Sequence, residues 1–329
     1  MKSIAIIGAG IAGITLARQL QDSAEVRVFE KSRGFGGRMA TRRSGSFHFD
    51  HGAQFFTARS KQFQKLINDC VAENQITAWQ PRVLTLDPEE KPFKREWFEP
   101  HYVAVPGMNT LCKVLAQELK VSLDTQVASI EAEEQGWMLK DYVGNRLGQF
   151  DWVISTAPAP QTDELLPECF AHKAALNEVD FSPCFSLMLG FETAPKLNFD
   201  AAVVRNSALG WIASNCRKQN RPDSSSLLVH SDNEWARTQF ECSTDVVRDR
   251  MLAACAELLG DQMPPPEHIA IHRWKYAKAE TSLEDDFLLD EPNRLAACGD
   301  WCGGSRVEDA FVSALKLGER LKTICCREA

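Results

Sequence analysis

One stretch near the amino terminus decides the fold: SIAII at Ser3–Ile7, then GAGIAG at Gly8–Gly13, and an acidic residue at Glu30. Ser3–Ile7 is continuously apolar and ends at glycine, which is typical of a parallel strand buried on both faces. Residues 14–20 have the composition of a helix, and Val26–Phe29 is typical of a second strand. The order strand, glycine turn, helix and strand predicts an α/β protein with a Rossmann-like nucleotide-binding unit.

Each glycine of this motif has a physical role. Gly8 permits the tight turn, Gly10 lets a pyrophosphate approach the backbone, and Gly13 lets the helix pack on the strand. The helix start offers free N–H groups to phosphates, and an acid that closes the next strand is placed for a ribose. A dinucleotide site is predicted, although a glycine-rich turn without a ligand is the alternative. Its members are Gly8, Gly10, Ala12, Gly13 and Glu30.

The residues after Glu30 favour FAD over NAD. Lys31 opens a basic run that contains the sequence GGR at Gly36–Arg38. This run resembles the second half of the dinucleotide motif of amine-oxidase-like FAD flavoproteins, which simple NAD dehydrogenases lack. The resemblance places Gly37 beside the pyrophosphate and makes Arg38 its brace, with Lys31 also near the cofactor. A flexible basic loop is the alternative interpretation.

Distant segments also match this class of flavoprotein. Arg294–Asp300 predicts a short strand that ends in a turn, and a helix is predicted from Val307 to Leu321. In the class, the Gly-Asp pair that ends at Asp300 holds the ribityl and pyrophosphate groups, and the helix that starts at Val307 points at the flavin. Asp151–Pro158 resembles a buried strand of the same domain. Val127 is expected to meet the adenine with its backbone, or else to be an ordinary core valine.

Four motifs resemble the renalase family, in the family's order and over nearly the whole chain. They are FDHGAQFFT at Phe49–Thr57, VPGMN at Val105–Asn109, HRWKYA at His272–Ala277 and GDW at Gly299–Trp301. The resemblance implies an FAD-dependent oxidase that converts the 2- and 6-dihydro isomers of NAD(P)H to NAD(P)⁺. Dioxygen would reoxidise the flavin and yield H₂O₂. The expected partners are thus a small-molecule dinucleotide substrate and O₂.

Oxidation of a dihydronicotinamide needs a slot for the ring and little acid–base help, because hydride leaves carbon directly. We therefore predict no catalytic side chain. Gln54 and Phe55 are expected at the flavin, and Thr57, Arg59 and Trp274 at the substrate. Ordinary loop and core positions are the alternative for these residues.

Two other functions stay open. An amine oxidase or a related C–N or C–C oxidase shares the FAD motifs. However, its two-sided aromatic cage is not evident before the last predicted helix, and the chain has three tyrosines in all. A FAD-binding protein without turnover is the third possibility. Cys302 lies near the cofactor loop, but its neighbours do not match a site of covalent attachment, so we expect non-covalent FAD.

The motifs predict two domains. A discontinuous Rossmann-like FAD-binding domain of amine-oxidase type comprises residues 1–57, 101–160 and 292–329. A mixed α+β substrate domain comprises residues 58–100 and 161–291. Within the latter, we expect antiparallel strands between 185 and 230, and a helix at 245–259.

Charge and composition limit the other functions. The 329-residue chain has a net charge of −8, which does not favour nucleic acid or a membrane surface as partner. Residues 1–60 nevertheless carry nine basic and four acidic side chains, which favours an anionic ligand there. Eleven unevenly spaced cysteines predict reduced thiols and a cytoplasmic protein, and the seven histidines form no metal motif. Residues 217–226 are polar and contain a proline, so we expect an exposed loop.

Overall fold

The computed structural model describes residues 1–327, and its first sheet has six strands in the order β19-β20-β13-β1-β2-β9. All neighbouring strands are parallel except β19 and β20. The strands are β1 (Ser3–Ile7), β2 (Glu25–Phe29), β9 (Val121–Ser122), β13 (Trp152–Ser155), β19 (Leu288–Asp290) and β20 (Leu295–Ala297). The apolar run that opens the sequence is thus a central strand, with Ile4, Ala5 and Ile6 fully buried.

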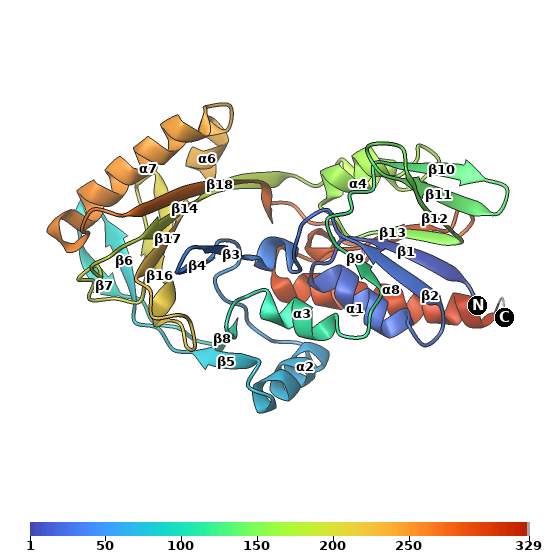
Figure 1. Cartoon of the computed structure of the whole chain (residues 1–329), viewed down its shortest axis with the longest axis horizontal. Helices are drawn as coiled ribbons and strands as arrows, with labels where there is room; N and C mark the ends of the chain where they lie inside the picture. The colour runs from blue at the N-terminus through green and yellow to red at the C-terminus, as the bar shows by residue number, and fades with distance from the viewer. Residues whose placement is uncertain (328–329) are drawn as a thin grey trace.

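Helices cover this sheet. α1 (Ile11–Leu20) contacts both α3 (Thr110–Leu115) and α8 (Val307–Arg327), and α8 runs beside α1 in Figure 1. α2 (Lys61–Ala72) also reaches α8, where the rings of Phe63 and Phe311 lie 4.9 Å apart. This packing places the amino termini of α1 and α8 near the ends of the parallel strands.

The second large sheet has seven strands in the order β18-β14-β17-β16-β15-β6-β7, and it forms the opposite lobe in Figure 1. α6 (Asn233–Gln239) packs on β14, and α7 (Thr244–Leu259) packs on β16 and β18. The strands are β6 (Val83–Asp87), β7 (Glu90–Lys94), β14 (Phe181–Gly190), β15 (Ala201–Val204), β16 (Leu209–Ser214), β17 (Ser226–Ser231) and β18 (His268–Ala279). The predicted antiparallel strands and the helix at 245–259 are confirmed.

Smaller elements join the two lobes. The hairpin of β3 (Thr41–Ser44) and β4 (Phe47–Asp50) lies between them in Figure 1. β5 (Ile76–Trp79) pairs with β8 (His101–Ala104). The remaining elements are β10 (Ser129–Glu133), β11 (Gly136–Lys140), β12 (Arg146–Phe150), α4 (Ala159–Leu165), α5 (Lys173–Leu176), and the 3₁₀ turns η1 (Gly37–Met39), η2 (Asn215–Arg217), η3 (Gly260–Gln262) and η4 (Asp300–Cys302).

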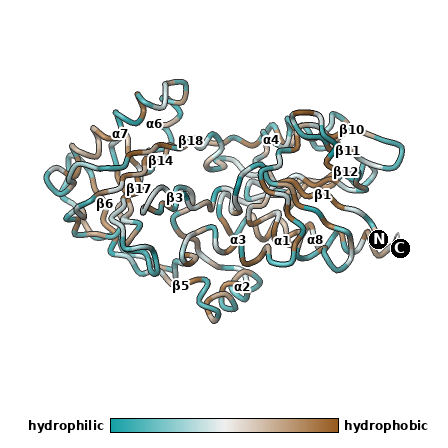
Figure 2. Tube along the Cα trace, viewed as in Figure 1, coloured by the Kyte–Doolittle hydropathy of each residue, from teal (hydrophilic) through white to brown (hydrophobic). Residues whose placement is uncertain are grey.

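The hydropathy pattern follows this architecture. Figure 2 shows hydrophobic segments along β1 in one lobe and along β14 in the other, with hydrophilic loops at the outside. No helix within residues 1–327 is both long enough and apolar enough to cross a membrane.

The division into two domains stays a prediction, but α2 and β5, assigned to the substrate domain, share a core cluster with β1 and α1.

The prediction of an exposed loop at 217–226 is wrong for the central part of this segment. Lys218 and Arg221 are buried, with side chains that are 0% exposed, because each forms an ion pair with Asp50.

Candidate active site

The predicted dinucleotide residues meet at one edge of the six-stranded sheet. Gly8 follows β1, Glu30 follows β2, and Asp300 follows β20, so all three lie where parallel strands end. In open α/β sheets, ligands bind at this carboxyl edge. Residues separated by almost three hundred positions therefore face one site.

The glycines fall into two kinds. A Cβ on Gly13 would lie 2.0 Å from the Gly8 carbonyl oxygen, so this glycine is required where α1 crosses β1. By contrast, a Cβ on Gly10 would meet its nearest atom, the Gly36 oxygen, at 3.9 Å, and one on Gly37 would meet the Gly10 Cα at 3.7 Å. Packing therefore does not demand glycine at 10 or 37, although the left-handed backbone of Gly37, with φ of +52°, favours glycine there. The open space along both backbones fits a pyrophosphate beside the start of α1.

Glu30 is 6% exposed and lies under this turn. Its two carboxylate oxygens accept hydrogen bonds from the backbone N–H groups of Ala9, at 2.9 Å, and Ser32, at 2.7 Å. A carboxylate has about four acceptor positions, so Glu30 can still accept from ribose hydroxyl groups. Lys31 beside it is exposed, and Val127 is 6% exposed in an apolar cluster with Phe29. Ala12 is 5% exposed in the first turn of α1.

Arg38 and Asp300 connect the two ends of the chain. The guanidinium group donates two hydrogen bonds to the carboxylate, at 2.7 and 2.6 Å. Asp300 is 4% exposed, whereas the side chain of Arg38 is 29% exposed. The Arg38 carbonyl accepts from the Ala53 N–H at 2.8 Å, and a Cβ on Gly52 would lie 1.9 Å from it. We call the set of Gly8, Gly10, Glu30, Gly37, Arg38 and Asp300 the cofactor cradle. The segment that leads to Gln54 and Phe55 is packed directly on it, at the carbonyl of Arg38.

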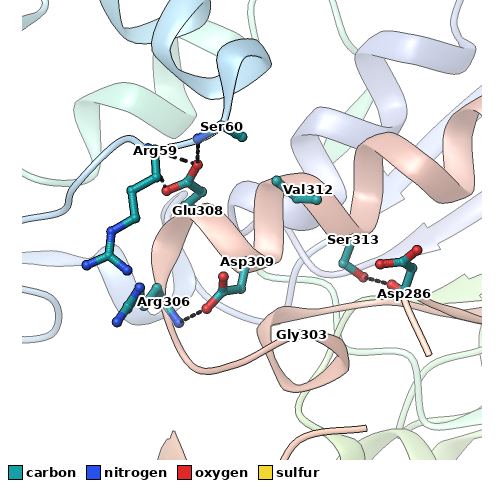
Figure 3. Close-up of a pocket in the computed structure, with 9 residues that line it drawn as sticks. All are labelled: Arg59, Ser60, Asp286, Gly303, Arg306, Glu308, Asp309, Val312 and Ser313. Carbon is teal, nitrogen blue, oxygen red and sulfur yellow. Dashed lines mark hydrogen bonds between the residues drawn. The ribbon is translucent and has the colours of Figure 1, made fainter. Parts of the chain in front are cut away.

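The start of α8 lines a cavity of about 310 Å³ (Figure 3). Val307, the first residue of the helix, packs against the core, and the next two residues are acidic. Glu308 accepts from the backbone N–H groups of Arg59 and Ser60, and Asp309 accepts from those of Ser305 and Arg306. These carboxylates order the loops around the helix start.

Next to the cradle lies a buried charged group that we call the Asp50 cluster: Asp50, Gln54, Lys218 and Arg221. Asp50 Oδ2 accepts from Lys218 Nζ at 3.1 Å and from Arg221 Nη2 at 2.8 Å. Oδ1 accepts from the Thr41 hydroxyl at 2.7 Å and from the Met108 N–H at 3.0 Å. Gln54 accepts from Lys218 at 3.2 Å and donates to the Asp50 and Gly52 carbonyl oxygens.

The Asp50 cluster holds more positive than negative charge. The side chains of Asp50, Lys218 and Arg221 are all 0% exposed, so two cations share one carboxylate away from water. Although burial opposes it, the two neighbouring cations hold the pKa of Asp50 far below its usual range. Burial lowers the pKa of Lys218 to about 8, against the opposing effect of Asp50. Neither cation is recognisable from the sequence, because a polar segment with a proline is typical of an exposed loop.

Trp274 lies in a second cluster, with His51, His230 and His272. Its indole N–H donates to the His51 carbonyl oxygen at 2.8 Å, and the Ser186 hydroxyl donates to the same oxygen at 2.7 Å. His230 is 3.3 Å from that oxygen. Burial lowers the pKa of His51 and of His230 to about 4, so both are neutral at pH 7. Trp274 thus fixes the loop next to Gly52.

The ring of Phe55 is surrounded by other aromatic rings. We call Phe55, Trp79, Trp97, His101 and Trp211 the Phe55 cluster. The ring centres of the other four lie 5.9, 5.0, 4.6 and 5.9 Å from that of Phe55, in that order. Lys218 Nζ lies 5.6 Å from the centre of the Trp79 ring, so the Phe55 cluster adjoins the Asp50 cluster.

The two remaining predicted substrate residues lie farther along the same segment. Thr57 is half-buried. Arg59 is exposed and donates to the Glu99 carboxylate at 2.8 and 2.5 Å. In Figure 3 its guanidinium group lies on the same side of the α8 start as Arg306. Gln54, Phe55 and Thr57 thus lie along one segment that starts at the cradle, and Arg59 lies at its exposed end.

Family models match most of the chain. A flavin containing amine oxidoreductase model matches residues 96–320, and an NAD(P)-binding Rossmann-like domain model matches residues 6–70. The chain therefore belongs to the flavin containing amine oxidoreductase family. It is a flavin oxidoreductase with FAD as its cofactor and a small molecule as its substrate, as the sequence predicted.

Within this family the chain is renalase-like. It is 24% identical to renalase from Mus musculus over 98% of this chain and 99% of that protein. Two solved structures share the fold. One, from an Exiguobacterium species and named for protoporphyrinogen oxidase, has a TM-score of 0.76 at 15% identity, with 98% of this chain and 99% of that chain covered. A putrescine oxidase bound to putrescine has a TM-score of 0.69 at 11% identity, with 98% of each chain covered.

Proposed function

We propose that this flavin oxidoreductase oxidises the 2- and 6-dihydro isomers of NAD(P)H. The substrate loses hydride to become NAD(P)⁺, and O₂ accepts the two electrons together with two protons to become H₂O₂. One of these protons comes from the solvent, so one dihydronicotinamide, one O₂ and one proton are consumed. The full-length similarity to a renalase supports this reaction.

The observation that carries the proposal is the excess positive charge of the Asp50 cluster. One member of this cluster, Gln54, directly precedes Phe55 in the chain. Asp50, Lys218 and Arg221 are fully buried, where charges interact more strongly than in water. Alkylamines are ammonium ions at neutral pH, and the net positive charge of Lys218 and Arg221 over Asp50 would repel such a further cation. A dihydronicotinamide ring is uncharged before it reacts, so the same charge does not exclude it.

FAD, when bound, accepts hydride from the substrate and passes the electrons to O₂. The chain's part is to bind and orient the two dinucleotides. Gly10, Gly37 and the start of α1 would hold the pyrophosphate, and Glu30 the ribose. The Arg38 guanidinium and Asp300 would lie alongside. Hydride loss needs no base at carbon, and His51 is a weak base, because burial lowers its pKa to about 4.

Non-covalent attachment of FAD is part of this proposal. Cys302 is 1% exposed, and burial raises the pKa of its thiol to about 12. A thiol must ionise to act as a nucleophile, so Cys302 is poorly suited to bond to a flavin. Acid precipitation of the purified protein is expected to release all of its flavin into the supernatant. Flavin that stays in the pellet would contradict this part of the proposal.

The test is anaerobic mixing of the holoenzyme with 6-dihydro-NAD(P), ordinary 4-dihydro NADH and a set of amines. Only the 6-dihydro isomer is expected to bleach the flavin rapidly, and admission of O₂ is expected to restore the colour with one H₂O₂ per flavin. Lys218→Met removes one of the two buried positive charges and makes the Asp50 cluster neutral. This variant is expected to discriminate less strongly against amines. Lys120→Met is the matched control, because it removes the same charge from an exposed pair with Glu25.

An amine oxidase is the second candidate, favoured by the family model and by the fold shared with a putrescine oxidase. In that case amines bleach the flavin and the dihydronicotinamides do not. Equal reduction by 4-dihydro NADH would also overturn the proposal.

A further inference from the structure

The Phe55 cluster lies beside the segment that packs on the cofactor cradle. Phe55 follows Gly52 and Ala53, which pack on the carbonyl of Arg38 in the cradle. Across from it, Trp211 stands on β16 of the seven-stranded sheet. The cluster thus fills the space between the cradle and this sheet with aromatic rings.

Two indole N–H groups of the cluster lack a hydrogen-bond partner. Trp97 Nε1 and Trp211 Nε1 are buried and unpaired in the described part of the chain. An unpaired indole alone proves little, because Trp152 Nε1 is unpaired as well. Trp152, however, is 0% exposed inside the apolar core, whereas Trp97 and Trp211 are partly exposed around Phe55. A buried donor without an acceptor is unfavourable, and a ligand oxygen placed against the indole N–H would remove that cost.

Trp97 lies in a loop whose neighbouring side chains are exposed to solvent. It lies between β7 and β8, its neighbours Glu96 and Phe98 are exposed, and Phe98 is 96% exposed. Glu99, two residues on, forms the ion pair with Arg59, and surface pairs of this kind contribute little to stability. Trp97 therefore lies on a loop between two strands, whereas Trp211 lies within strand β16.

We propose that the Phe55 cluster is the subsite for the dihydronicotinamide ring. The Trp211 indole N–H donates to the carboxamide oxygen of that ring, and Trp97 is a wall that moves to admit it. The inference rests on the proposed function and names the residues that select its substrate. Positive charge appears on the ring only as hydride leaves, so the Asp50 cluster does not oppose binding of the neutral ring, and the faces of the surrounding aromatic rings offset its repulsion of the cation that forms.

The first test is anaerobic reduction of the holoenzyme by 6-dihydro-NAD, which separates the apparent Kd from the limiting rate. Trp211→Phe keeps the ring and removes the donor. It is expected to raise the apparent Kd about two- to tenfold, the range for one neutral hydrogen bond, with little change in the limiting rate. Trp152→Phe is the matched control and is expected to change neither. FAD content and circular dichroism check that both variants fold.

The second test removes the acceptor from the ligand. NAD⁺ and an NAD⁺ analogue without the carboxamide are titrated into the wild type and Trp211→Phe, with the flavin spectrum as readout. If the indole donates to the carboxamide, the wild type discriminates between the two ligands and the variant does so about two- to tenfold less. Equal discrimination by both proteins would overturn the role of Trp211.

The wall is tested separately. Trp97→Ala is expected to raise the apparent Kd for 6-dihydro-NAD more than Trp97→Phe does, because only the alanine removes the ring. Identical constants for both variants and the wild type would overturn this assignment. Failure of the proposed function looks different: the wild type itself would not be reduced by 6-dihydro-NAD. Normal reduction of the wild type with unchanged variants overturns the subsite alone.

Discussion

The cofactor cradle and the two clusters facing it are built in different ways. The cradle uses short motifs at the ends of neighbouring parallel strands, so Gly8, Glu30 and Asp300 meet because the sheet brings their strands together. The Asp50 and Phe55 clusters join single residues from loops and strands far apart, such as Asp50 and Lys218, 168 positions away. The cofactor contacts proposed for the cradle come from backbone N–H groups and from side chains at strand ends, whereas those proposed for the facing clusters come from side chains of scattered residues.

This contrast separates two kinds of constraint. A backbone cradle needs glycine and a strand end, and it serves many reactions of one cofactor. Side-chain clusters carry charge and shape, which differ between substrates. We therefore expect substitutions in the cradle to act mainly on FAD binding, and those in the facing clusters on stability or on the substrate.

The largest effect is expected for Asp50→Asn. Its amide leaves Lys218 and Arg221 buried without a counter-charge, and removal of one partner from a buried ion pair costs about 3–5 kcal/mol. The free energy of unfolding from urea titration measures this loss. Asp180→Asn, which breaks an exposed pair with Arg237, is the control and should cost less than about 1 kcal/mol. Equal losses for both variants would mean that the Asp50 cluster admits water.

In the cradle, two glycine substitutions should separate folding from cofactor binding. Gly13→Ala places a Cβ 2.0 Å from the Gly8 carbonyl oxygen and should destabilise the protein with or without FAD. Gly10→Ala meets no atom closer than 3.9 Å, so it should fold normally but retain FAD roughly tenfold more weakly, because the methyl group occupies the pyrophosphate's space. Flavin content and thermal midpoints with and without added FAD measure both. Normal FAD retention by Gly10→Ala would move the pyrophosphate elsewhere.

The cradle could be predicted from sequence because its signals are local. The apolar strand, the glycine turn and the acid at Glu30 lie within one short stretch, and the predicted helix from Val307 has its start where expected. A local signal of this kind survives because the strand, the turn and the helix each have their own sequence pattern.

The facing clusters could not be predicted, for physical reasons. Lys218 and Arg221 are polar residues in a segment with a proline, and only the distant Asp50 makes their burial possible. Trp79, Trp97 and Trp211 are ordinary core tryptophans in the sequence until the fold gathers them around Phe55. Gln54 was expected at the flavin, and its amide lies among Asp50, Gly52 and Lys218.

A smaller effect is expected from pH. Burial holds the pKa of His51 and His230 at about 4, below the usual 6.5. Between pH 6.5 and 4 the unfolded chain therefore binds more protons than the folded one, so stability falls as the pH falls through this window. Urea midpoints across the window measure the slope. His230→Gln, which keeps a donor for the His51 carbonyl but does not titrate, should reduce it; an unchanged slope would show that His230 charges without cost.

The smallest effect is expected at the surface, where the cradle and the facing clusters meet. Glu99→Gln breaks the exposed pair with Arg59 and should leave the unfolding midpoint unchanged. If Arg59 binds the substrate, as the sequence predicted, its released guanidinium group should lower the apparent Kd for 6-dihydro-NAD about twofold. That gain should fade at high salt, since exposed charges are screened. Arg59→Gln should raise the same apparent Kd. If neither variant changes this constant, Arg59 does not bind the substrate, and its pair with Glu99 only connects two surface segments.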